Sequence, residues 1–87
     1  MILHHYRTTT GREVGILLED AAGRLVGLEV KASSTVGRKD FSGFDALSED
    51  TGQQFVRGVV LYTGEQPIAF AERYVAMPIS ALWRMTA

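Results

Sequence analysis

Cysteine is absent from this 87-residue sequence, and so are long hydrophobic runs. Without thiols, the chain has no disulfide, no thiolate zinc site and no cysteine nucleophile. The longest apolar runs, such as residues 59–62, contain four residues, whereas a membrane-spanning helix needs about 20. The first residues, MILHHYR, also lack the apolar stretch of a secretory signal. We therefore expect a cytoplasmic protein without a membrane segment.

A strong excess of one charge is also lacking. The chain has nine basic and ten acidic residues and a net charge of −1, whereas an obligate nucleic-acid-binding domain usually carries a clear basic excess. No G-x-x-x-x-G-K-[ST] motif occurs, so the chain itself has no loop of the kind that holds the phosphates of ATP. At this length we expect one domain over residues 1–87, with a thin margin of stability.

The first third of the chain predicts three strands. Residues 2–8 are the first candidate. In REVGILLED, residues 12–20, apolar positions alternate with the others, and this period of two predicts a strand. The Ala-Ala-Gly connection at 21–23 suits a hairpin, and RLVGLEVKAS, residues 24–33, is the returning strand.

The pattern then changes from strand to helix and back. Aromatic and aliphatic residues recur every three positions in DFSGFDAL, which predicts a helix over residues 38–51. Residues 55–64 contain a continuous apolar run typical of a buried strand, and residues 68–80 contain two short strand-like pieces. A strand, a helix and a strand in succession predict parallel pairing between 24–33 and 55–62.

These elements predict an α/β fold with a mixed sheet and the order β-β-β-α-β-β. The predicted helix covers one face of that sheet. The other face has only the short C-terminal segment to cover it. We therefore expect a further covering element, either from upstream of Met1 or from a partner chain.

Glu29 and Lys31 stand two residues apart in the third predicted strand, so both point to the same face. One interpretation is an ion pair on a half-exposed strand, which contributes ~0–1 kcal/mol. The other is a metal-dependent phosphodiesterase site, because Mg²⁺ prefers oxygen ligands and a nearby cation can stabilise charge that develops on a phosphate. The pair alone does not decide between them.

A resemblance to a known family rests on five segments in order: HHYRTTTGREVGILLED, LVGLEVKASSTV, DFSGFDAL, FVRGVVLYTGE and MPISALW. Together they resemble the domain of unknown function that follows the ATPase core in many bacterial and archaeal AAA+-like ATP-binding proteins. The pair GREVGILLED and RLVGLEVKAS is similar to the core of the PD-(D/E)XK nuclease superfamily. The resemblance implies a restriction-endonuclease-like fold whose first covering helix is missing from this chain.

The resemblance also implies roles for individual residues. Glu29 would bind a metal ion, and Lys31 would position the attacking water. The leading aspartate of the superfamily falls on Gly15, which offers no ligand. Glu13 lies on the same face as Gly15 but roughly 7 Å further along the strand, so it would be a weak substitute. We therefore expect a degenerate catalytic site.

Two functions follow as hypotheses. The first is a non-catalytic accessory domain of an ATP-binding protein, here without its N-terminal ATPase module. It would bind nucleic acid or a protein partner, and the ATPase domain or a second copy of the chain are candidate partners. The alternative is an active nuclease that uses Glu29 and Lys31 with Mg²⁺ as cofactor. Whether the chain is an enzyme stays open at this point, because Gly15 replaces the expected ligand.

Overall fold

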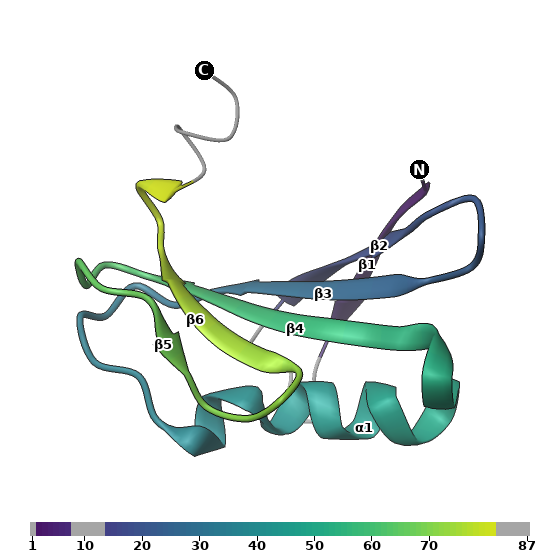
Figure 1. The fold of residues 1–87 in the computed structure, drawn as a ribbon. Coiled ribbons are helices and arrows are strands. Elements are labelled where there is room, and N and C mark those ends of the chain that lie inside the picture. The colour runs from purple at the N-terminus through teal and green to yellow at the C-terminus, as the bar shows by residue number, and fades with distance from the viewer. Residues whose placement is uncertain (1, 8–13, 82–87) are drawn as a thin grey trace.

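The computed structural model describes residues 2–7 and 14–81 of the chain. Six strands and one α-helix follow one another, with a 3₁₀ turn on each side of the helix (Figure 1). The elements are β1 (Ile2–Arg7), β2 (Val14–Glu19), β3 (Leu25–Val30), η1 (Arg38–Phe41), α1 (Ser42–Thr51), η2 (Gly52–Gln54), β4 (Phe55–Tyr62), β5 (Ile68–Ala69) and β6 (Tyr74–Pro78).

The strands form one mixed sheet in the order β1-β2-β3-β4-β6-β5. The pairs β1–β2, β2–β3 and β5–β6 are antiparallel. The pairs β3–β4 and β4–β6 are parallel. The predicted mixed sheet, the crossover helix and the parallel pairing of 24–33 with 55–62 are therefore confirmed. The two strand pieces expected within 68–80 are β5 and β6, and β6 is the one that lies beside β4.

Side chains alternate between two faces along the strands, as a period of two requires. In β3, Leu25, Gly27 and Glu29 are buried, whereas the residues between them are partly or fully exposed. The buried set faces α1, because the ring of Phe44 in α1 lies against Gly27. The predicted division of β3 into two faces is confirmed.

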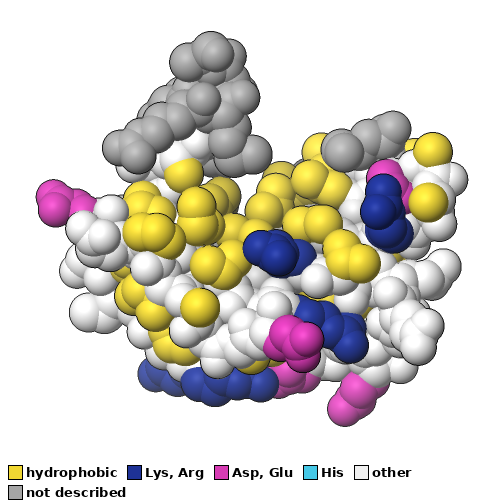
Figure 2. Space-filling model, in the orientation of Figure 1, with side chains coloured by type: hydrophobic (Ala, Val, Ile, Leu, Met, Phe, Trp, Pro, Cys, Tyr) yellow, Lys and Arg dark blue, Asp and Glu magenta, His cyan; other side chains and the backbone are white. Residues whose placement is uncertain are grey.

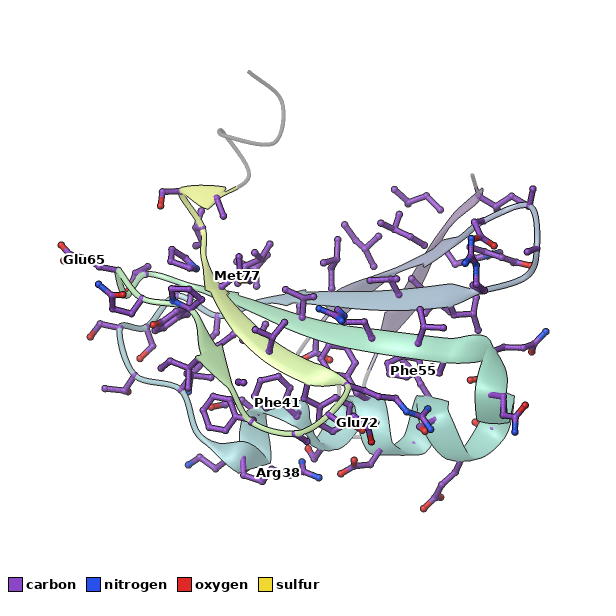
Figure 3. All side chains as sticks on the ribbon, viewed as in Figure 1. Arg38, Phe41, Phe55, Glu65, Glu72 and Met77 are labelled. Atoms are coloured by element: carbon purple, nitrogen blue, oxygen red, sulfur yellow. The ribbon has the colours of Figure 1, made fainter. Side chains whose placement is uncertain are left out.

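The hydrophobic core lies between the sheet and the helical segment, which consists of η1 and α1. Phe41 at the end of η1 and Phe44 in α1 are fully buried, and Phe41 stacks on Tyr74 of β6 with ring centroids 5.3 Å apart. Figure 3 places Phe41 between the helical segment and the strands. The helix then ends at Gly52, whose positive φ of 61° suits glycine. The buried cluster consists of Leu25, Phe41, Phe44, Phe55, Val60, Tyr62, Tyr74 and Ala76.

Two glycines let α1 approach the centre of the sheet. A Cβ atom at Gly27 would lie 2.6 Å from the Phe44 ring, and one at Gly58 would lie 2.5 Å from it. Gly27 and Gly58 are register partners in the parallel pair β3–β4. The Phe44 ring therefore rests on a strip of bare backbone formed by neighbouring strands, and any larger residue there would displace it.

The sheet face away from α1 is covered by no helix of the described part of the chain. Figure 1 shows α1 on the opposite side of the sheet. None of the described helices has the length and apolar character to cross a membrane.

Candidate functional site

Glu29 lies near the end of β3 on the face that α1 covers, with 4% of its surface exposed. It sits between two strands. Gly15 of β2 is its antiparallel register partner, and Val60 of β4 is its parallel one. β3 lies in the interior of the sheet, between β2 and β4. A strand in this position favours apolar residues, because both of its faces can be buried. A carboxylate at this place is therefore a marked exception to its surroundings.

Gly15 is also buried, and it faces Glu29 directly across the β2–β3 pair. Residues opposite each other in an antiparallel pair have Cβ positions ≈ 4.5–5.5 Å apart, close enough for two carboxylates to share a metal ion. Glycine supplies no such group. Glu13, the proposed substitute ligand, lies outside the described residues.

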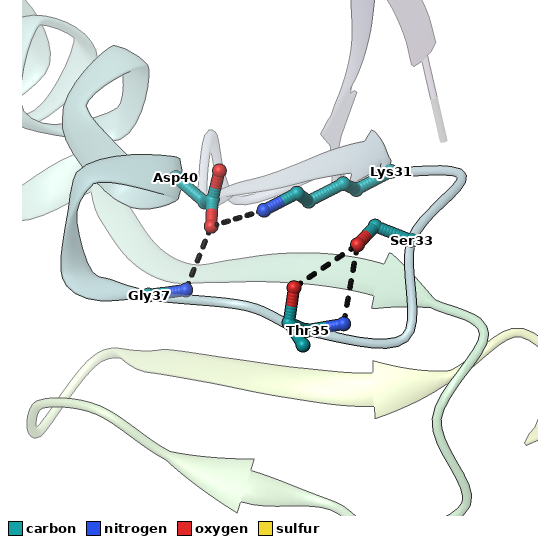
Figure 4. A network of polar contacts seen from close by, with 5 residues as sticks. All are labelled: Lys31, Ser33, Thr35, Gly37 and Asp40. Atoms are coloured by element: carbon teal, nitrogen blue, oxygen red, sulfur yellow. Dashed lines mark hydrogen bonds and ion pairs between the residues drawn. The ribbon is translucent and has the colours of Figure 1, made fainter.

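Lys31 extends the β3 ladder by one residue beyond the strand. Its backbone N–H donates to the Leu61 carbonyl at 2.8 Å, so the main chain still runs beside β4. Its Nζ donates to Oδ2 of Asp40 in η1 at 2.7 Å (Figure 4). About a third of the Lys31 side chain is exposed (30%), against 11% for Asp40. The ion pair is therefore partly shielded from water, and it joins the end of β3 to the start of the helical segment.

Asp40 is held on two sides. Its Oδ2 also accepts the backbone N–H of Gly37 at 2.7 Å, and its own N–H donates to the Gly37 carbonyl at 3.0 Å. Burial opposes ionisation of Asp40, but the Gly37 N–H and the Lys31 ammonium outweigh it and hold the pKa of Asp40 below its ordinary value. Asp40 therefore carries a negative charge that Lys31 already balances.

Ser33 and Thr35 shape the loop between β3 and η1. The Thr35 N–H donates to Ser33 Oγ at 3.2 Å, and the two hydroxyl oxygens are 3.2 Å apart (Figure 4). The Ser33 carbonyl accepts the N–H of Thr63, which follows β4. These bonds are typical of a serine turn. They give Ser33 a structural role in the chain reversal.

A second polar cluster joins the helical segment to Tyr74 of β6. The Tyr74 hydroxyl donates to Asp45 Oδ1 at 2.6 Å, and Arg38 donates to the same oxygen at 3.3 Å. The Arg38 guanidinium also lies over the Tyr74 ring, 5.1 Å from its centroid. The Tyr74 hydrogen bond holds the pKa of Asp45 below its ordinary value, assisted by Arg38 and opposed by burial. Burial, with Asp45 adding to it, raises the pKa of Tyr74 to about 12.

A family model for a domain of unknown function, DUF4143, matches residues 1–82. The chain belongs to the DUF4143 family. No curated protein and no solved structure matches it. For a DUF4143 domain, the family description gives no activity, so the function has to be argued from the arrangement of the residues themselves.

Histidine and acidic side chains are dispersed over the described residues of this DUF4143 domain. Among them no group of three or more histidine or acidic side chains comes together. Glu29 has a glycine opposite it, and Asp40 is already bound by Lys31 and Gly37. Within the same described part, every buried side-chain nitrogen or oxygen has a hydrogen-bond partner. The arrangement is chemically that of a satisfied polar cluster inside a fold.

The sequence pointed to Glu29 and Lys31, and the structure places both on the face covered by α1. It did not point to Asp40, the partner of Lys31. A signal was present, because Asp40 stands three residues after Gly37 at the start of a helical segment, where an acidic side chain commonly accepts the backbone N–H of the capping residue. Asp45 carried no comparable signal, since its partner Tyr74 is far away in the sequence.

Proposed function

We propose that this DUF4143 domain is a non-catalytic accessory module of an ATP-binding protein, built on a restriction-endonuclease-like core, and that it binds a protein partner. The observation that carries the proposal is the Lys31–Asp40 ion pair of 2.7 Å beside a Glu29 that faces Gly15. Both halves of the expected catalytic pair are present in the sequence, yet their surroundings differ from those of a hydrolytic site.

The core assignment is supported by topology. Three antiparallel strands lead into a crossover helix and then into a parallel strand. Glu29, Val30 and Lys31, here called the E-V-K motif, lie at the end of β3, in the centre of the sheet. The proposed superfamily places its glutamate and lysine at this point of the fold. Fold likeness alone does not fix activity, which depends on the groups at the site.

Hydrolysis of a phosphodiester would demand two things that the described residues do not offer. One is a set of oxygen ligands able to hold Mg²⁺, which is normally bound through at least one or two accessible carboxylates. The other is a lysine whose ammonium is directed at water or phosphate. Here the Lys31 ammonium is directed at Asp40. We assign the pair Lys31 and Asp40 to holding the end of β3 and the start of the helical segment together.

A protein is favoured over nucleic acid as the partner because of charge and hydrophobicity. The chain carries nine basic and ten acidic residues, so no general attraction to phosphates is expected. Several large apolar side chains are exposed, including Leu3 and Val30 at 54% and 64%. Exposed apolar surface of this kind is typical of protein interaction sites.

Metal binding tests the non-catalytic assignment. The melting temperature of the protein and of Glu29→Gln is measured with and without Mn²⁺ and Mg²⁺. Since the wild-type site has Gly15 where a ligand is required, we expect the same shift, or none, in both proteins. A metal-dependent rise that only the wild-type protein shows would contradict the proposal and support the active Mg²⁺-dependent nuclease.

A further inference from the structure

We draw no further inference here: the strongest candidate, the group of hydrophobic side chains on the sheet face away from α1 (Figure 2), carries no proposal, because nothing in the described part of the chain shows what covers it.

Discussion

The ammonium of Lys31 lies 2.7 Å from Oδ2 of Asp40, and this contact joins the end of β3 to the start of the helical segment. The lysine that the resemblance assigns to water is thus bound to a carboxylate nine residues further along the chain. Together with Gly15 in register with Glu29, this contact supports the proposal that Glu29 and Lys31 have a structural role.

A double-mutant cycle tests the structural role of this ion pair. Lys31→Met and Asp40→Asn are each expected to lower the free energy of unfolding by about 1–2 kcal/mol, because each leaves a partly buried group without its charged partner. The double variant should lose less than the sum, with a coupling of about 1 kcal/mol. The measurement is urea denaturation of all four proteins.

The exposed pair Arg24–Asp20 supplies the control for that cycle. Its atoms are also 2.7 Å apart, but 67% of the Arg24 side chain is exposed. Its coupling should be smaller than that of Lys31–Asp40, because water screens the attraction between exposed charges. If the two cycles gave equal coupling, the Lys31–Asp40 pair would have no special part in the fold.

The packing of Phe44 on bare backbone predicts sharp intolerance at two glycines. Gly58→Ala and Gly27→Ala place a methyl group within 2.6 Å or less of the Phe44 ring, and overpacking of this kind typically costs 1–3 kcal/mol. Gly37→Ala is the control, because nothing lies within 4 Å of the added atom. Thermal denaturation compares the three, and an unchanged melting temperature for Gly58→Ala would refute the packing described here.

Gly15→Asp tests the missing ligand. A carboxylate at position 15 would stand opposite the buried Glu29, so the variant should be less stable than the wild-type protein without metal because like charges repel. Mn²⁺ should restore part of the lost melting temperature by binding both carboxylates. Gly15→Asn, which adds a similar volume without the charge, should respond less to Mn²⁺. No response in Gly15→Asp would count against the placement of a metal site here.

The raised pKa of Tyr74 predicts that the protein loses stability at high pH. Its pKa rises from 10.0 to about 12 in the folded protein, so the fold favours the protonated hydroxyl. The resulting stabilisation is complete below pH 10 and disappears as the pH rises from 10 through about 12. Urea midpoints across this range should therefore fall more steeply for the wild-type protein than for Tyr74→Phe. Parallel curves for the two proteins would contradict the burial of the Tyr74 hydroxyl and its hydrogen bond to Asp45.

Much of the fold could be predicted because the hydrophobic patterns that indicate its strands and helix lie within short segments of the sequence. Alternation along 24–33 predicted that Glu29 and Lys31 share a face, and the structure shows that α1 covers this face. The spacing of Phe41 and Phe44 likewise predicted the helical segment that covers that face. These relationships need only the period of the backbone.

The remaining features depend on which distant segments meet. The position of β6 between β4 and β5 follows from a crossover that strand periodicity does not specify. The contact between Tyr74 and Asp45 spans 29 residues. The need for glycine at 27 and 58 becomes visible only once Phe44 is placed between them. In each case tertiary packing selects one partner among several that local pattern allows.

Cleavage of nucleic acid tests the central claim most directly. Fluorescently labelled single- and double-stranded DNA and RNA are incubated with the wild-type protein and with Lys31→Ala, in Mg²⁺ and in Mn²⁺. Because Lys31 is bound to Asp40 and Glu29 faces Gly15, we predict no cleavage above the protein-free control for either protein. Metal-dependent cleavage by the wild-type protein that Lys31→Ala abolishes would contradict the account.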